Sequence, residues 1–422
     1  MRCACWIESF LLCLFGLAAC GGDGYAVSAC RSWRGDSLVL GAEVFSAYLS
    51  DLKGKTVAVV SNQTGVVPVA DGKALGGTGF IEGLDGRCYR HLVDVWLDSG
   101  LAIKKIFSPE HGFRGTAEAG AKVKSGVDVQ TGLPVVSLYG SHKKPAPEDL
   151  QGIEAVVFDL QDVGVRFYTY VSTLHYVMEA CAESGIPVWV LDRPNPHAGY
   201  IDGPVLDTVC CRSFVGLHPV PMVYGMTIGE YARMINGEGW LKNGVRCDLK
   251  VVPLVNYRRG STRYVFPVPP SPNLRTMKAI HAYPSLCLFE GTPVSLGRGT
   301  SEPFSCFGFP GCTRGNYSFT PRAMAGLSEN PPCKNQVCTG FLLPDSIGRT
   351  LPQALNLDYL LQMYAAWPQK ESFFTSFFAK LAGTPELAAQ IKRGEDAATI
   401  RASWQPALRN FDTLRRKYLL YP

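Results

Sequence analysis

Between residues 102 and 115 the sequence reads Ala102-Ile103-Lys104-Lys105-Ile106-Phe107-Ser108-Pro109-Glu110-His111-Gly112-Phe113-Arg114-Gly115. The apolar residues at its start are typical of a short strand, and the proline and two glycines after them stop the strand from continuing. The loop that follows carries a carboxylate, an imidazole and a guanidinium on Glu110, His111 and Arg114. Because ligands of open α/β sheets bind at the carboxyl ends of strands, Glu110 is the first candidate for a catalytic acid or base.

The same pattern recurs along the first half of the chain. Further apolar runs predict strands at residues 55–62, 135–138, 155–160 and 186–191. Apolar residues at helical spacing predict helices at residues 41–52, 90–97 and 168–184. Strands that alternate with helices favour a parallel sheet covered on both faces, and polar residues follow the end of each strand.

The pattern changes after residue 203. Residues 227–236 are expected to form a helix, with Thr227 as its N-cap and Glu230 completing a capping box. A strand at residues 249–254 and a proline-rich segment follow. We therefore expect an α/β fold, with a Rossmann-like parallel sheet in an N-terminal domain at residues 39–210 and a smaller α+β C-terminal domain at residues 211–422.

The N-terminus carries an apolar run, Phe10–Cys20, that is too short for a comfortable membrane-spanning helix. Its last residues, Leu17-Ala18-Ala19-Cys20, are similar to a bacterial lipoprotein lipobox. We expect a signal peptide at residues 1–19, lipid on Cys20 and a tether at residues 20–38. The protein would then be exported, and either periplasmic or anchored to a membrane by its lipid. An ordinary secretory signal with an accidental cysteine is the alternative.

Composition and missing motifs argue against several function classes. The chain has 422 residues, of which 46% are hydrophobic and 18% charged, with a formal net charge of +5, as in a folded globular protein. Its basic residues are scattered, which argues against nucleic-acid binding. The sequence has no Gly-x-Ser-x-Gly elbow, no phosphate-binding glycine loop opening a helix and no His-Glu-x-x-His helix. We expect no cofactor.

Fifteen cysteines are unusually many for this length. In an oxidising compartment some could form disulfides, and they could equally be small buried apolar residues. The candidates are Cys210, Cys211, Cys306, Cys312, Cys333 and Cys338. A zinc site is disfavoured, because no Cys-x-x-Cys pair occurs and the histidines are not spaced near the cysteines.

Two loop carboxylates suggest glycoside hydrolysis. Glu110 and Glu290 come from different expected domains, so a cleft between the domains could bring them face to face. One carboxyl group would protonate the leaving-group oxygen, and the other would act as base or nucleophile on the far side of the sugar. Two structural roles stay open, a turn cap for Glu290 and a salt bridge between Glu110 and Arg114.

Other side chains are candidates for binding the substrate. Asp162 and Arg166 follow a buried strand, and could form a positioning ion pair or bind sugar hydroxyls. Tyr168 could stack on a sugar ring. Arg298 suits an anionic substituent such as a lactyl or peptide carboxylate. The remaining candidates are His111 and Arg114 beside Glu110, and Arg193 and Asn195 in a loop stiffened by prolines.

Eight motifs follow one another in a fixed order. They are Asn62-Gln63-Thr64-Gly65, Ser108–Gly112 with Arg114-Gly115, Asp162–Tyr170, Leu191–Pro196, Gly225–Glu230, Pro270–Asn273, Glu290–Thr292 and Gly297–Thr300. Together they closely resemble the exo-β-N-acetylmuramidase (NamZ-like) family, from about Gly41 to the C-terminus. Many relatives have a histidine just before Gly-Met-Thr, and this chain has Tyr224 there.

The resemblance implies a Rossmann-like domain, an α+β domain and an active site in the cleft between them. It implies release of N-acetylmuramic acid from the non-reducing ends of peptidoglycan fragments, either muropeptides or MurNAc-GlcNAc. Glu110 carries over as the catalytic acid/base, and we assign Glu290 as the second catalytic group from its placement. Tyr224 and Asn273, which lie in or beside these motifs, join the candidates for substrate binding. The alternatives are a non-catalytic lipoprotein that binds muropeptides or sugars, and an esterase or amidase that acts on the same polymer.

Overall fold

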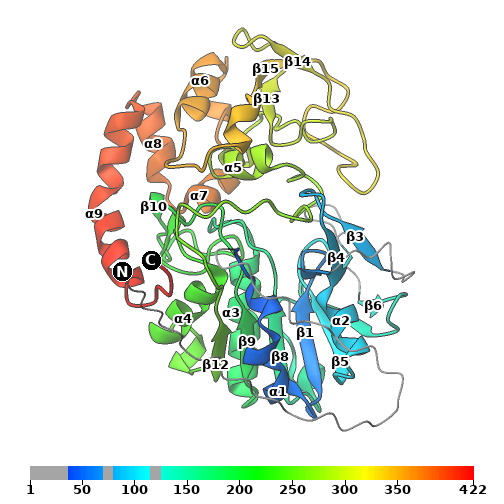
Figure 1. The fold of residues 1–422 in the computed structure, drawn as a ribbon. Helices are drawn as coiled ribbons and strands as arrows, with labels where there is room; N and C mark the ends of the chain where they lie inside the picture. The colour runs from blue at the N-terminus through cyan, green and yellow to red at the C-terminus, as the bar shows by residue number, and fades with distance from the viewer. Residues whose placement is uncertain (1–36, 70–78, 115–124) are drawn as a thin grey trace, which may run out of the picture. The chain divides into compact units, whose positions relative to one another are not determined.

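The computed structural model describes residues 37–69, 79–114 and 125–422. Its main element is a seven-stranded sheet in the order β12-β9-β8-β1-β5-β7-β6 (Figure 1). The strands are β1 (Val57–Ser61), β5 (Ile103–Ser108), β6 (Gly126–Val127), β7 (Pro134–Ser137), β8 (Ala155–Asp159), β9 (Val188–Leu191) and β12 (Leu249–Val252). All neighbours pair in parallel except β6, which runs antiparallel to β7. The predicted α/β class is confirmed. The expected signal peptide and Cys20 lie outside the described residues.

The central strands show why this sheet forms. β1 and β8 are buried along their whole length. Ala58 and Val60 pack into one hydrophobic core, whereas Val57 and Val59 pack into a second core. Successive side chains of a strand point to opposite faces, so an unbroken apolar run is what a sheet covered on both faces requires.

Helices contribute to both cores. The helices α3 (Tyr170–Glu183) and α4 (Ile228–Gly237) supply residues to the core that contains Ala58, and α2 (Leu92–Asp98) supplies residues to the other. Helix α4 begins with the predicted capping box. Thr227 Oγ1 accepts a hydrogen bond from the Glu230 backbone at 3.3 Å, and Glu230 accepts one from the Thr227 backbone at 2.9 Å.

The segment at residues 41–52 is not the single amphipathic helix that its sequence predicts. It forms three short turns, η1 (Gly41–Glu43), η2 (Phe45–Ala47) and α1 (Leu49–Leu52). Between them, Val44 has a non-helical backbone with φ −84° and ψ 58°. Tyr48 is buried edge-on against Trp96, and its hydroxyl donates to the carbonyl of Ala42 at 2.8 Å. Packing of this tyrosine therefore outweighs helix propensity.

The sheet continues past the domain boundary expected at residue 210. Strand β12 pairs in parallel with β9, from Leu249 opposite Val188 to Val252 opposite Leu191. A hairpin of β10 (Asp202–Val205) and β11 (Pro221–Val223) precedes β12 in the sequence. The change of pattern after residue 203 thus marks this hairpin and not the end of the sheet.

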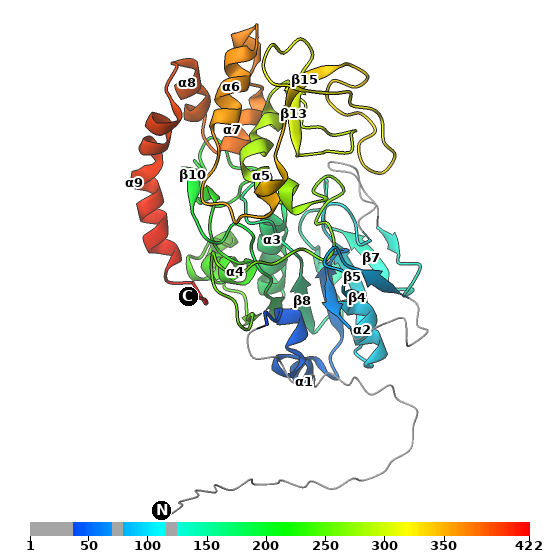
Figure 2. The same cartoon turned by 45° about the horizontal axis from the view of Figure 1, so that its top comes forward.

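Two further small antiparallel sheets accompany the main sheet. One, of order β2-β4-β3, belongs to the N-terminal part, and the other, of order β13-β15-β14, combines with helices in the C-terminal part, which confirms its predicted α+β character. Their strands are β2 (Val66–Pro68), β3 (Phe80–Glu82), β4 (Cys88–His91), β13 (Cys306–Phe309), β14 (Tyr317–Phe319) and β15 (Cys338–Leu342). The helices are α5 (Met277–Leu286), α6 (Asp358–Ala366), α7 (Ser376–Ala382), α8 (Glu386–Lys392) and α9 (Ala397–Arg415). Helix α9 packs against β10, as Figures 1 and 2 show.

The cysteines in the described part of the chain are free thiols. Most are buried, as expected of small apolar residues: Cys181, Cys211, Cys247, Cys287, Cys306, Cys312 and Cys338. Within the described ranges, no helix is long and apolar enough to cross a membrane. The same residues contain no cluster of three or more His, Cys, Asp or Glu side chains that could hold a metal ion.

Candidate active site

A cavity of about 830 Å³ is lined by residues from both parts of the chain. Glu110 enters it from the loop after β5, and Tyr139 from the loop after β7. The C-terminal part contributes Glu290 from the turn η6 (Cys287–Gly291) and Arg298 from the loop that follows. The structure thus brings both candidate carboxylates to one cavity at the carboxyl edge of the sheet.

Among the described residues, the hydroxyl groups of Thr169 and Tyr139 form hydrogen bonds to the carboxylate of Glu110. Thr169 Oγ1 donates to Oε2 at 3.0 Å, and the hydroxyl of Tyr139 forms a second hydrogen bond. Burial, and then the nearby Glu110 carboxylate, raise the pKa of Tyr139, so that the phenol keeps its proton and donates it. Directly after Glu110 the backbone turns left-handed, with φ 72° at His111 and 74° at Gly112. His111 itself is buried and lines the cavity.

Glu290 faces the cavity as part of an ion pair and not as a turn cap. Its Oε1 accepts from the guanidinium of Arg298, and the thiol of Cys287 approaches Oε2 at 3.6 Å. Burial alone would lower the pKa of Arg298, but the charge of Glu290 leaves that pKa above its usual value. The same guanidinium lies over the ring of Phe304, 4.9 Å from its centroid.

Asp162 and Tyr224 form a buried pair, in which the Tyr224 hydroxyl donates to Oδ2 of Asp162. The backbone N–H of Gly164 donates to the same oxygen at 2.7 Å. Burial raises the pKa of Asp162 to about 6 in spite of these donors. The ion pair considered between Asp162 and Arg166 does not form, since Arg166 donates to the carbonyls of three other residues, Pro204, Val220 and Leu381, at 2.8–3.0 Å. Its guanidinium thus connects β10, the residue before β11, and α7.

The polar residues after β9 also form hydrogen bonds and ion pairs within the fold. Arg193 forms a two-pronged ion pair with Asp159 at 2.6 and 2.9 Å, and both side chains are almost fully buried. Asn195 donates to the carbonyl of Met226 at 2.7 Å. Asn273, in the proline-rich motif, donates to the carbonyl of Leu327 at 3.0 Å. Among the described residues, the cavity lining includes none of the three.

Arg114 lies beside the main cavity and does not form the salt bridge considered with Glu110. It donates to Asp128 at 2.8 and 3.0 Å, and approaches Asp94 at 3.5 Å. Arg114 lines a smaller cavity of about 400 Å³, which shares Ser271 and Leu327 with the main one. Two carboxylates therefore balance its charge.

Comparison with known proteins identifies the family. Residues 57–278 match the family model "Exo-beta-N-acetylmuramidase NamZ, N-terminal", and residues 281–421 match "Exo-beta-N-acetylmuramidase NamZ, C-terminal". The chain belongs to the exo-β-N-acetylmuramidase NamZ family. The resemblance inferred from the eight motifs is thus confirmed.

Relatives of this NamZ-family chain cover nearly its whole length. It is 36% identical over 400 residues to the peptidoglycan β-N-acetylmuramidase NamZ of Bacillus subtilis (strain 168), a match that covers 89% of each chain. A crystal structure of a DUF1343 family protein from Bacteroides fragilis is 41% identical, with a TM-score of 0.78 over 91% of this chain and 99% of that one. A second DUF1343 structure from the same species is 26% identical, with a TM-score of 0.73 over 92% and 100% of the two chains.

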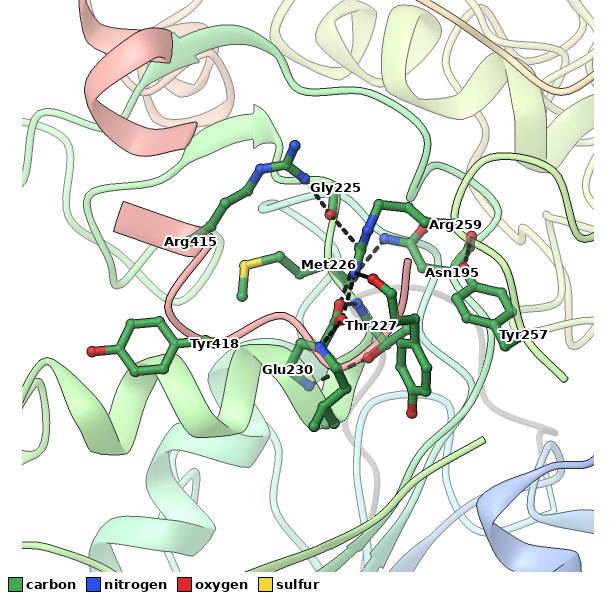
Figure 3. Close-up of polar contacts among 12 residues, drawn as sticks. Asn195, Gly225, Met226, Thr227, Glu230, Tyr257, Arg259, Arg415 and Tyr418 are labelled. Atoms are coloured by element: carbon green, nitrogen blue, oxygen red, sulfur yellow. Dashed lines mark hydrogen bonds and ion pairs between the residues drawn. The ribbon is translucent and has the colours of Figure 1, made fainter. Parts of the chain in front are cut away.

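The Gly-Met-Thr motif of this NamZ-family chain has a structural role (Figure 3). The carbonyl of Gly225 accepts from Arg415 at 2.6 Å and from Arg259 at 2.9 Å. Arg259 also forms an ion pair with Glu230 of the capping box at 2.5 Å. Gly225 has φ 60°, and a Cβ there would lie 2.6 Å from the carbonyl oxygen of Tyr200. Only glycine fits this turn.

Several residues that line the cavity of this NamZ-family chain were not predicted from its sequence. They are Tyr139, Lys143, Thr169, Phe214, Tyr283 and Phe304. The strand-end pattern could have found Tyr139, because it follows β7 as Glu110 follows β5. Tyr283 lies within helix α5. From the sequence alone, an aromatic residue of a helix that lines a cavity cannot be distinguished from one that packs in the core. Tyr168 lines the cavity as proposed from the sequence, and its hydroxyl donates to the carbonyl of Pro270 at 2.9 Å.

Proposed function

We propose that this cavity cleaves N-acetylmuramic acid from the non-reducing ends of peptidoglycan fragments, with Glu110 as the general acid/base. The observation that carries the proposal is the carboxylate of Glu110, which lies in the cavity at the sheet's carboxyl edge between the donors Thr169 and Tyr139. Membership of the NamZ family supports the reaction class. The named activity of the Bacillus subtilis relative supports peptidoglycan as the polymer.

The two carboxylates suit the two halves of a glycosidase reaction. The carboxyl group of Glu110 donates its proton to the oxygen that joins the two sugars, which makes the leaving group neutral. Glu290 is the anionic member of the ion pair with Arg298. An anion in the same cavity stabilises the positive charge that develops on the sugar ring, or attacks the anomeric carbon. A water molecule then supplies the hydroxyl group of the released sugar, and its proton passes to a carboxylate of the cavity, which replaces the proton that Glu110 gave. Both carboxylates contribute to the electrostatic environment of Tyr139, which lies near each of them.

The cavity walls suit a sugar. Aromatic rings present flat apolar faces to the C–H groups of a pyranose, and the polar groups between them bind its hydroxyls. The aromatic residues of the lining are Phe167, Tyr168, Phe214, Tyr283, Phe289, Phe304 and Phe377, together with Tyr139.

The test is incubation of the purified protein with a chromogenic β-glycoside of N-acetylmuramic acid, and separately with its N-acetylglucosamine analogue. We expect release of the chromophore from the first glycoside, and release of free N-acetylmuramic acid from MurNAc-GlcNAc. Release of peptide or acetate alone would favour an amidase or esterase. Tight binding of muropeptides without any turnover would favour the non-catalytic alternative.

We also propose that the chain is exported and carries lipid on Cys20, so that it acts at a membrane facing the periplasm. The lipobox-like end of the apolar N-terminal run supports this proposal. Mass spectrometry of the mature protein should show an acylated N-terminal cysteine, and Cys20→Ala should abolish acylation and membrane fractionation. An unmodified N-terminus at another position would contradict the anchor.

A further inference from the structure

The cavity contains two cationic side chains that differ in what balances their charge. Among the described residues, Lys143 and Arg298 are the lysine and arginine side chains of its lining. Arg298 pairs with Glu290, so its charge is already compensated. Lys143, in contrast, has no aspartate or glutamate within ion-pair distance in the described part of the chain. An anionic group of a substrate gains more from the uncompensated charge.

Lys143 lies on the same wall of the cavity as the proposed acid. Its ammonium group is 4.9 Å from the ring centroid of Phe214, which it faces. The ring of Phe214 is 6.0 Å from that of Tyr139, and the hydroxyl of Tyr139 bonds to Glu110. One aromatic ring thus separates the lysine from the tyrosine that holds the acid. Lys143 as a whole is half-buried.

The neighbouring lysine provides an internal contrast. Lys144 forms ion pairs with Glu179 at 2.8 Å and Glu183 at 2.6 Å, and both partners belong to helix α3. It does not belong to the described lining of the cavity. Of these two adjacent lysines, Lys144 therefore forms ion pairs with helix α3, and Lys143 lines the cavity.

We propose that Lys143 binds the carboxylate of the substrate's lactyl group and makes the enzyme select N-acetylmuramic acid over N-acetylglucosamine. The proposal rests on the function proposed above. N-acetylmuramic acid differs from N-acetylglucosamine only in the lactyl ether on C3. C3 lies two bonds from the anomeric carbon, C1, along the ring. When the anomeric carbon lies beside Glu110, a group on C3 reaches along the wall toward Phe214 and Lys143. From the sequence, recognition of this carboxylate was assigned to Arg298. Because Arg298 forms an ion pair with Glu290, we assign this role to Lys143.

The test compares three chromogenic β-glycosides: that of N-acetylmuramic acid, that of its neutral lactyl carboxamide, and that of N-acetylglucosamine. For Lys143→Met we expect kcat/KM on the first glycoside to fall roughly 10- to 100-fold through KM, as for loss of one charge-assisted hydrogen bond. Activity on the carboxamide should hardly change. The preference for carboxylate over carboxamide should therefore disappear. Lys143→Arg should restore part of it, and the control Lys144→Met should keep the wild-type preference.

Two results would overturn the assignment. One is an equal loss on carboxylate and carboxamide substrates, as a purely structural lysine would give, and the other is an unchanged preference in Lys143→Met. If the wild type cleaves none of the glycosides, the proposed function fails and calorimetry decides the lysine's role separately. Free N-acetylmuramic acid should then bind the wild type more tightly than N-acetylglucosamine and lose that advantage in Lys143→Met. Equal binding of both sugars by the wild type would reject it.

Discussion

The hydroxyl of Tyr421 donates a hydrogen bond of 2.5 Å to the buried carboxylate of Asp192, at the end of β9. The same oxygen accepts from Thr227 Oγ1 at 2.7 Å, and the other oxygen accepts from the backbone of Gly229 at 2.8 Å. The backbone of Leu420 donates to Glu230 at 2.7 Å. The segment after α9 is therefore fastened to two buried acids beside the Gly-Met-Thr turn.

This arrangement predicts a pH-dependent effect of Tyr421→Phe. Burial raises the pKa of Asp192 to about 7, although its hydrogen-bond donors oppose the shift. Because this value exceeds that of the unfolded chain, about 3.9, the stability contributed by Asp192 falls as the pH rises through this window. Removal of a donor to the charged form should lower the free energy of unfolding by about 1.5–3 kcal/mol at pH 8, and by less at pH 5.

Urea unfolding at pH 5 and pH 8 measures this difference. Tyr418→Phe is the matched control, because the Tyr418 hydroxyl donates at 2.5 Å to Glu238, a carboxylate whose side chain is 22% exposed and therefore partly hydrated. We expect a smaller, pH-independent loss for the control. An equal loss for Tyr421→Phe at both pH values would contradict the role assigned to Asp192.

Arg193→Met should destabilise the fold without weakening substrate binding. The variant leaves Asp159 charged and buried without its partner, which costs about 3–5 kcal/mol. Thermal unfolding and the KM of the folded fraction separate the two effects. The double variant Asp159→Leu/Arg193→Met should recover much of the loss, because no charge is then left buried. A raised KM at unchanged stability would instead support the substrate-binding role predicted from the sequence.

Tyr139→Phe should slow turnover more than it weakens binding. The variant keeps the ring against Phe214 but removes the hydroxyl that donates to Glu110. We expect kcat to fall by about 10-fold, equivalent to one hydrogen bond of ~1.4 kcal/mol, with KM nearly unchanged. Tyr176→Phe is the control, because the ring of Tyr176 stacks on that of Phe214 at 6.3 Å between centroids and Tyr176 does not belong to the described lining of the cavity. A change in KM alone would assign Tyr139 to binding.

Local patterns predicted the sheet and the position of Glu110. The unbroken apolar run Val57–Val60 is recognisable as part of a buried strand, and Pro109 with Gly112 marks where β5 ends. The capping box of Thr227 and Glu230 is similarly local. These features depend on residues that are close together in the sequence.

Long-range contacts could not be predicted in this way. Arg166 and Arg193 follow strands, as substrate-binding residues do, but both are buried among carbonyls or with a carboxylate. In a sequence, a polar residue that stabilises the fold and one that binds substrate both appear as a polar residue after a strand. The sequence also does not show that Arg298 pairs with Glu290, or that Lys143 lies over the ring of Phe214. These two contacts are the reason for assigning the substrate's carboxylate to Lys143.

The most direct test of the account is the turnover of Glu110→Gln on the chromogenic glycoside of N-acetylmuramic acid. Its control is Glu148→Gln, because Glu148 is exposed and does not belong to the described lining of the cavity. Loss of general acid catalysis predicts a fall in kcat of about 10²- to 10⁴-fold, with binding of N-acetylmuramic acid retained and the control fully active. Turnover by Glu110→Gln at the rate of the wild type would contradict the assignment of the acid.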